Sequence, residues 1–405
     1  MGYDIISKPS NLDVFGRTQV ATPYSIVEWT GYKPDQIGAG EIFGEFTETG
    51  GTVTHNATSK SYEINTTATS GSTACMRTNK WYRYQPGRAQ LLLCTFDAAP
   101  TDTNLTQQIG LFDSDDGVFF EIAGTDLNMV IRTSVSGSVV NNAVARANWN
   151  GDKLDGTGSS GITLDLTKSQ LLCIMHAFLG VGEVRYGFLI DGDFHLCHSV
   201  KNSNNTAQKY MRSGTLPFSA IINNTAATSG TNKFQLHCFN IESLGGGDYK
   251  EPQGTLESKT VTEATVTTTQ EAVLAIRPKL NYNSETNRSI AIITGIRFMT
   301  SGDEVKAYIR IGGSVTGGSW NSGSGEAFET NTTMSNYSGT HTVLTPLLNN
   351  NQSVSLSEKD LASFTLTNDA FATAAGDGDI VVITMKSLGT TTSVDVSLEW
   401  KEIYR

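Results

Sequence analysis

Short runs of alternating apolar and polar residues, separated by Gly, Asn, Asp and Ser, extend along most of this chain. Alternation with a period of two places side chains on opposite faces of a β-strand, and turn-forming residues between such runs are typical of hairpins. Residues 107–112 and 118–122 have this pattern, and the acidic stretch 113–117 between them ends in Asp-Gly, which favours tight turns. The two runs are therefore predicted to form a β-hairpin.

The apolar run at residues 171–179 fits either a buried strand or a short helix by its pattern alone. The residues that follow favour the strand. After a Gly-rich turn, residues 183–190 and 194–200 are strand-like, and Asp191 with Gly192 signals a hairpin between them. A three-stranded meander needs an extended first member, so we predict that residues 171–179 form a buried strand.

The second half of the chain continues with β-branched and apolar runs, which predict strands at residues 258–269, 289–298, 305–311, 380–385 and 394–400. We predict that the last two of these strands pair with each other. Residues 312–339 are rich in Gly, Ser and Asn and are predicted to form an exposed loop.

Three consecutive glycines at positions 245–247 begin a polar stretch that reads as a hinge. The sequence thus predicts an all-β protein. Its parts are an N-terminal jelly-roll or concanavalin-like sandwich at 35–245, a linker at 246–254 and a C-terminal β-sandwich at 255–405. Residues 1–34 are predicted to be an attachment arm or, alternatively, the first strand of the sandwich.

Composition agrees with this fold class, because the 405 residues include only 17% charged residues and 40 glycines. A formal net charge of −11 disfavours a sequence-independent grip on nucleic acid, which needs clustered Lys and Arg. No apolar run approaches the ~20 residues of a membrane span, so we expect no membrane insertion. The polar N-terminal residues lack the layout of a signal peptide, and we expect synthesis in the cytoplasm.

Two groups of side chains have the chemistry of metal ligands. Asp152, Asp155 and Asp165 surround the Gly-rich stretch 156–161 and could chelate calcium. The simpler alternative is that these carboxylates cap turns by accepting hydrogen bonds from nearby backbone amides.

A zinc site is the second metal alternative, with Cys173, His195 and Cys197 as its ligands. The chain has five cysteines and no C-x-x-C pair, and in a reducing cytosol the simpler expectation is buried free thiols. The sequence therefore predicts no bound metal and no other cofactor.

Catalytic residues are not evident in the sequence. Glycoside hydrolysis needs two neighbouring carboxyl groups, whereas Glu121, Glu183, Asp191 and Asp193 are scattered, and the last two flank a hairpin turn. We therefore expect a protein without enzymatic activity.

Exposed aromatic residues would favour sugar binding, and Trp81, Tyr82 and Tyr84 are the candidates. On a strand, Tyr82 and Tyr84 would share one face and Trp81 the other, so one set is expected in the core.

Several blocks carry a resemblance to a known family, and they are residues 13–20, 77–88, 113–120, 130–134, 149–158, 160–165, 182–198, 242–247, 276–278 and 397–403. With Pro23, Tyr249, Glu251, Pro252, Gly254, Asn287 and Arg288, they resemble virion structural proteins of tailed bacteriophages, especially environmental ones. The resemblance implies a protein displayed on the phage particle as head decoration, as a head or neck fibre, or as a tail or baseplate component. It implies other virion proteins as partners and, by analogy with phage appendages, a homotrimer.

Two further functions remain open beside the purely structural one. The same particle protein could be a glycan-binding module that recognises the host receptor, or a polysaccharide depolymerase. The segment 11–34 combines large apolar residues with Pro23 and Pro34, and we predict that it attaches the protein to the particle through Phe15, Arg17, Tyr24 and Trp29.

Overall fold

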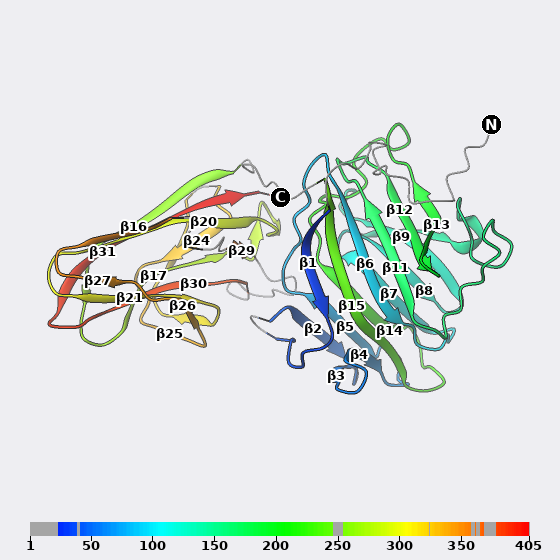
Figure 1. Cartoon of the computed structure of the whole chain (residues 1–405), viewed down its shortest axis with the longest axis horizontal. Helices are drawn as coiled ribbons and strands as arrows, with labels where there is room; N and C mark the ends of the chain where they lie inside the picture. Colours follow the sequence, from blue (N-terminus) through cyan, green and yellow to red (C-terminus); the bar gives the residue numbers. More distant parts are fainter. Residues whose placement is uncertain are drawn as a thin grey trace. The chain divides into compact units, whose positions relative to one another are not determined.

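The computed structural model describes residues 23–38, 41–245, 254–323, 325–357, 361, 365–367 and 378–404. The chain divides into two compact units, one consisting of Met1–Gly38 and Ile42–Asp248, the other of Ala39–Glu41 and Tyr249–Arg405. Apart from one 3₁₀ turn at Arg146–Asn148, every regular element in the described part of the chain is a β-strand (Figure 1). The predicted all-β class is therefore confirmed. Of the predicted linker 246–254, only Gly254 lies among the described residues.

The N-terminal unit is a sandwich of two antiparallel sheets (Figure 1). The eight-stranded sheet has the order β13 (Asp193–Val200), β12 (Val184–Ile190), β11 (Gln170–His176), β6 (Ala89–Asp97), β15 (Asn232–Leu244), β4 (Ser61–Thr66) and β3 (Thr52–Asn56), with β1 (Tyr24–Thr30) also paired to β15. The seven-stranded sheet has the order β10 (Val140–Ala145), β9 (Asp126–Thr133), β8 (Gly117–Ala123), β7 (Leu105–Phe112), β14 (Phe218–Asn224), β5 (Thr73–Thr78) and β2 (Phe43–Glu48).

The core of this unit lies between the two sheets, because each strand directs every second side chain inward. In β6, for example, Leu92, Cys94 and Phe96 are buried, and they share one apolar cluster with Ile109 and Leu111 of β7.

The hairpins predicted from turn residues are present, but Gly117 belongs to β8, and the turn before it is closed by the Asp113 N–H donating to the Asp116 carbonyl rather than by an Asp-Gly pair. β7 pairs with β8, and β11, β12 and β13 form the predicted meander, although β11 ends at His176 rather than at Leu179. The turn between β12 and β13 has positive φ angles at both Asp191 (53°) and Gly192 (87°), which is the geometry that an Asp-Gly pair favours.

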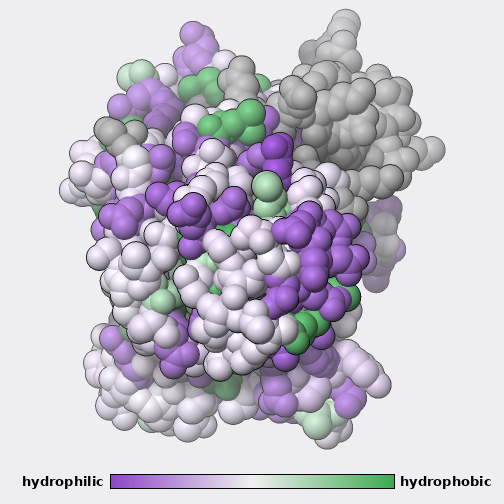
Figure 2. All heavy atoms as spheres, turned by 90° about the vertical axis from the view of Figure 1, so that its left-hand side faces the viewer, coloured by the Kyte–Doolittle hydropathy of each residue, from purple (hydrophilic) through white to green (hydrophobic). Residues whose placement is uncertain are grey.

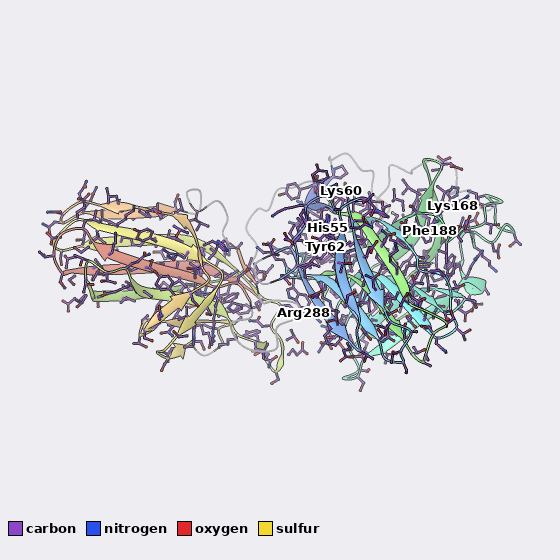
Figure 3. The ribbon with its side chains drawn as sticks, turned by 90° about the horizontal axis from the view of Figure 1, so that it is seen from below. His55, Lys60, Tyr62, Lys168, Phe188 and Arg288 are labelled. Atoms are coloured by element: carbon purple, nitrogen blue, oxygen red, sulfur yellow. The ribbon has the colours of Figure 1, made fainter. Side chains whose placement is uncertain are left out.

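The first strand, β1, belongs to the core of this sandwich. It pairs antiparallel with β15, and Trp29 lies opposite Phe239. The Trp29 ring is 4% exposed and contacts Phe43, Tyr62 and Phe239 at centroid distances of 4.9 to 5.7 Å. Tyr62 lies beside His55 of β3, with ring centroids 5.1 Å apart (Figure 3). The sandwich therefore includes β1, as the alternative of a first strand within residues 1–34 held.

A loop covers part of β13, the edge strand of the eight-stranded sheet. The Asn150 side chain donates to the carbonyl of Ser199 at 2.7 Å and accepts from its N–H at 2.8 Å. The next two backbone amides, of Gly151 and Asp152, donate to Cys197 and Leu196. Three loop residues thus form hydrogen bonds with backbone groups of Leu196, Cys197 and Ser199 on this edge.

The C-terminal unit contains two larger antiparallel sheets, and it follows the predicted sandwich class. The five-stranded sheet has the order β16 (Thr255–Val266), β31 (Thr392–Ile403), β20 (Ile290–Thr300) and β28 (Ser353–Ser357), with β29 (Thr365–Thr367) also paired to β20. The seven-stranded sheet has the order β23 (Trp320–Asn321), β24 (Phe328–Asn331), β17 (Glu271–Pro278), β30 (Val381–Ser387), β21 (Val305–Ile311) and β26 (His341–Leu344), with β27 (Leu347–Leu348) also paired to β21. Two small hairpins pair β18 (Asn281–Tyr282) with β19 (Glu285–Thr286) and β22 (Ser314–Thr316) with β25 (Asn336–Ser338).

The predicted pairing of residues 380–385 with 394–400 is wrong. The first run lies in β30, between β17 and β21, and the second lies in β31, between β16 and β20 of the other sheet. The connection between them is held by the β20–β21 turn, since Leu388 N–H donates to the Glu304 carbonyl and Thr390 N–H donates to Asp303. This contact directs the chain across the sandwich instead of back along β30.

The prediction of an exposed loop at residues 312–339 is also wrong in part. The segment contains four short strands, and β24 adds to the sheet beside β17. Phe328 is fully buried, while Trp320 and Tyr337 pack on Ala275 and Val382 on the outer side of the sheet. A few apolar side chains among the Gly and Ser residues are enough to fold the segment onto the sheet. In the space-filling view white and purple residues predominate, and green is confined to small separate patches (Figure 2).

Candidate functional site

A groove crosses the outer face of the seven-stranded sheet in the N-terminal unit. Its volume is about 260 Å³, and it is lined by Thr73, Thr106, Gln108, Ile221 and Asn223. These residues come from β5, β7 and β14, which are adjacent in the sheet. Because alternate residues of the same strands fill the core, the groove lies on the side of the sheet that faces away from the sandwich interior.

The floor of the groove is apolar and its walls are polar. Ile221 lies opposite Gln108 on one side and opposite Cys75 on the other. Burial raises the pKa of the Cys75 thiol to about 11, so this side chain is neutral near pH 7. On the wall, Asn223 Nδ2 donates to Thr73 Oγ1 at 2.5 Å.

A carboxylate held between two amides extends this polar surface across the sheet. Glu121 of β8 accepts one hydrogen bond from Gln108 Nε2 at 2.7 Å and another from Asn128 Nδ2 of β9 at 3.1 Å. Each amide has two N–H donors and one acceptor oxygen, so each keeps capacity for another partner. The arrangement presents hydrogen-bonding groups of both kinds in fixed positions.

An exposed aromatic ring lies on the same face near the edge of the sheet. Phe46 of β2 is 45% exposed and lies opposite Cys75, which in turn lies opposite Ile221. We call this cross-sheet line the groove row, and it consists of Phe46, Cys75, Ile221, Gln108, Glu121 and Asn128. Five steps between strands give it a length of about 24 Å.

The three aspartates considered for calcium each cap a turn, as the simpler alternative predicted. Asp152 is 2% exposed and accepts from the backbone N–H of Leu154 at 2.9 Å and of Ser160 at 2.7 Å. Burial alone would raise the pKa of Asp152, but these hydrogen bonds outweigh it and hold the pKa below its ordinary value.

Asp155 and Asp165 act in the same way on turns of their own. Each accepts from the backbone N–H and the hydroxyl of the threonine two residues later, Thr157 and Thr167. Hydrogen bonds from the two threonine hydroxyls are the main reason that the pKa of each aspartate is lowered.

The three residues considered for zinc lie on two strands that are not neighbours in the sheet. Cys173 is on β11, whereas His195 and Cys197 are on β13, and β12 lies between the two strands. Burial raises the pKa of Cys173 to about 12 and also raises that of Cys197. Among the residues that the structure describes, no three His, Cys, Asp or Glu side chains are grouped so that they could hold a metal ion.

The aromatic residues considered for sugar stacking do not form an exposed platform. Trp81, Tyr82 and Tyr84 are 4%, 9% and 3% exposed, and all three lie in the connection between β5 and β6. The expectation that one set lies in the core holds for all three residues, because the segment is not a regular strand and only Tyr82 makes a β-bridge, to Leu216. In this irregular segment all three side chains point inward.

The predicted attachment residues differ in their position and exposure. Phe15 and Arg17 lie outside the described residues. Tyr24 begins β1 and is 43% exposed, whereas Trp29 is buried in the sandwich core and is not available to a partner. Because β1 pairs with β15 along its length, Tyr24–Thr30 is the first strand, as the alternative interpretation held.

Sequence reasoning missed most of the groove. It considered Glu121 only as one of several scattered carboxylates, and it did not single out Gln108, Asn128 or Asn223. The available signal was the double amide in two strands, Gln107-Gln108 and Asn223-Asn224, in which one amide of each pair faces the groove and the other is buried.

No protein-family model and no curated protein matches the sequence. Among solved structures, similarity extends to a protein of unknown function from Shewanella oneidensis MR-1, with a TM-score of 0.38 and 9% identity over 58% of this chain and 92% of that chain. A β-glucanase of Bacillus licheniformis has a TM-score of 0.35 and 9% identity over 55% of this chain and 99% of that one. A legume lectin-like domain of Entamoeba histolytica has a TM-score of 0.30 and 9% identity over 55% and 98% of the two chains. Scores this low carry no inference about function. In the described part of the chain, no helix is long and apolar enough to cross a membrane.

Proposed function

We propose that this chain is a non-enzymatic glycan-binding protein whose sugar site is the groove on the seven-stranded sheet of the N-terminal unit. The observation that carries the proposal is the composition of the groove. Amide and hydroxyl side chains surround the apolar floor formed by Ile221, and Gln108 is held in place by Glu121. Sugars offer hydroxyl groups that donate and accept hydrogen bonds together with apolar C–H faces, and this surface is complementary to both.

The surroundings of Glu121 favour binding over hydrolysis. A glycosidase uses two carboxyl groups about 5–9 Å apart, one of which must give up a proton. Both oxygens of Glu121 instead accept hydrogen bonds from the amides of Gln108 and Asn128. These contacts use the carboxylate to orient its two amide neighbours, and none of the five residues that line the groove carries a carboxyl group, so a depolymerase is the less favoured function.

The wider setting that we propose is the surface of a tailed-phage particle, where the groove would recognise a host glycan. This part of the proposal rests on the sequence resemblance. Labelling intact particles with an antibody against the protein would test it, and we expect the antibody to bind. A count of the protein in purified particles is expected to give a constant copy number. Absence of the protein from purified virions would remove the phage setting and leave the glycan proposal standing.

Glycan binding itself can be tested on the full chain with a glycan array followed by calorimetry on the best ligand. Gln108→Ala and Asn223→Ala are each expected to weaken binding about tenfold, because each removes a hydrogen-bonding group worth roughly 1–2 kcal/mol. Gln235→Ala is the matched control, since Gln235 is also a half-buried strand amide, bonded to Ser61 and Glu63, but on the other sheet.

Two outcomes would contradict the proposal. If no array signal appears, or if groove and control variants bind equally well, the groove is not a sugar site. The purely structural function would then be the favoured one. If oligosaccharide products form during incubation and Glu121→Gln stops their formation, the protein is a depolymerase.

A further inference from the structure

Cationic side chains gather on the outer face of the seven-stranded sheet in the C-terminal unit. In β21, Val305, Ala307 and Ile309 are buried, so the alternating residues Lys306 and Arg310 face the other way, toward solvent. Tyr308 lies between these two cations, and Lys386 of the neighbouring strand β30 lies beside them. We call Lys306, Tyr308, Arg310 and Lys386 the cationic face.

Two lysines of this face lie directly opposite each other. In the antiparallel pairing of β21 with β30, Lys306 is the partner of Lys386. Directly opposite side chains on one face have Cβ atoms about 5 Å apart, and like charges at that spacing destabilise a sheet. Among the described residues, neither ammonium group has a carboxylate within ion-pair distance. Within the described part of the chain, the repulsion between the two ammonium groups is therefore not neutralised by an anion.

The two arginines on the same face differ in whether a carboxylate neutralises their charge. Arg277 of β17 donates to the Glu329 carboxylate at 2.7 Å, so its charge is matched. Arg310 instead donates to the hydroxyls of Thr384 and Thr340, both at 3.3 Å. Hydroxyl partners fix the orientation of the Arg310 guanidinium without neutralising it.

The Tyr308 ring contacts cations of its own chain. Lys306 Nζ lies 5.4 Å and Arg310 Cζ lies 5.5 Å from the ring centroid. These contacts hold both cations in place beside the ring. They also occupy the ring, which is therefore not an open surface for stacking.

We propose that the cationic face binds an acidic polysaccharide, one bearing carboxylate or sulfate groups, along the direction of β21. Lys306 and Lys386 together would hold one acidic group, which relieves their mutual repulsion. Arg310 lies four residues farther along the strand, about 13 Å away, and would hold a second group through two of its planar N–H donors. Two cationic points at this spacing favour an extended polymer over a single small anion.

An acidic polysaccharide is favoured over a nucleic acid because single-stranded nucleic acids bind by stacking bases on open aromatic rings, and the Tyr308 ring is in contact with two cations. The proposal concerns a different unit and a different ligand class from the groove, and it does not depend on the groove.

The single substitution Lys386→Glu gives a sharp test in the full-length protein. It replaces a like-charged pair by an opposite-charged one, so the melting temperature is expected to stay the same or to rise. Binding to a polyuronate, measured by calorimetry at low salt, is expected to weaken by more than tenfold. Loss of binding together with undiminished stability cannot come from unfolding.

The control separates the local site from the overall charge. Lys168→Glu makes the same change of charge at an exposed lysine of the N-terminal unit, labelled in Figure 3, and it is expected to leave polyuronate binding within about twofold of the parent. A neutral dextran should not bind to the cationic face, and Gln108→Ala in the groove should not affect polyuronate binding.

Several results would overturn the proposal. These are an absence of binding to polyuronate and to sulfated polysaccharide, an unchanged affinity in Lys386→Glu, and an equal loss in the Lys168→Glu control. Tighter binding to single-stranded DNA than to either acidic polysaccharide would assign the face to nucleic acid instead.

Discussion

The imidazole of His176 is fully buried inside the N-terminal unit, and its Nε2 lies 2.9 Å from Gln90 Oε1. A neutral ring that donates from Nε2 satisfies this contact. Burial lowers the pKa of His176 from 6.5 to about 4, because the charged imidazolium loses its hydration there. The folded protein therefore resists protonation of a group that the unfolded chain protonates readily.

This difference predicts a pH-dependent loss of stability. Above pH 6.5 the ring is neutral in both states, and as the pH falls from 6.5 to about 4 only the unfolded state takes up the proton. The free energy of unfolding is then expected to fall by up to about 3 kcal/mol through this group. Urea titrations at a series of pH values should show a shallower dependence in His176→Gln than in the parent. Parallel curves for the two proteins would contradict the assignment.

Asp152 supports a second prediction about a single side chain. Its carboxylate accepts from Leu154 and Ser160 and organises the loop that contains both residues. Asp152→Ala should lower the free energy of unfolding by about 1–3 kcal/mol, because buried amides lose their acceptor. Chelators and added calcium should leave the melting temperature of the parent unchanged. A clear rise with calcium would instead favour Asp152, Asp155 and Asp165 as its ligands.

Strand β1 determines how far the N-terminus can be truncated before the N-terminal unit loses part of its core. Trp29 fills a site between Phe43, Tyr62 and Phe239, and its Nε1 donates to Gln36 at 2.9 Å. Trp29→Ala is expected to lower the free energy of unfolding by about 3–5 kcal/mol. Removal of every residue before Lys33 deletes β1 and should abolish the cooperative unfolding of this unit in circular dichroism. A truncated chain that still melts cooperatively would show that β1 is dispensable for the core.

The strands themselves could be predicted from the sequence better than their partners. Period-two alternation identifies β7, β8, β12 and β13, and the Asp191-Gly192 turn identifies the hairpin of β12 and β13, since both signals are local. Alternation does not tell which strand lies alongside, and β30 and β31, close in sequence, belong to opposite sheets.

The candidate site was missed for the same physical reason. Gln108 and Asn223 meet only because β14 inserts between β7 and β5, and more than a hundred residues separate β14 from each of them. The double amides Gln107-Gln108 and Asn223-Asn224 are a local signal, but the sequence does not tell that the strands carrying them lie in one sheet.

Each of the two units has a hydrophobic core of its own. Trp29 and Phe239 belong to one apolar cluster, and Phe298 and Trp400 belong to another. Calorimetry is expected to resolve two unfolding transitions. Trp29→Ala should lower the midpoint temperature of one transition and Phe298→Ala that of the other, each by an amount equivalent to a loss of about 3–5 kcal/mol in the free energy of unfolding. A single transition that both substitutions shift equally would mean that the units unfold as one.

The assembly state is a separate property of the whole molecule, and the trimer expected from the resemblance stays a prediction. Light scattering of the full-length protein at micromolar concentration would measure it directly. A stable monomer would contradict the prediction for the free protein.

The pairing of Asn150 with Ser199 has a consequence for crowded solutions. An uncovered strand edge is a template on which another chain can continue the sheet, and this is a common route to aggregation. Here the Asn150 side-chain amide forms both hydrogen bonds with the backbone of Ser199, as a peptide group of another strand could. The N–H groups of Gly151 and Asp152 donate to the carbonyls of Cys197 and Leu196. The loop thereby blocks the addition of another strand along the covered part of this edge.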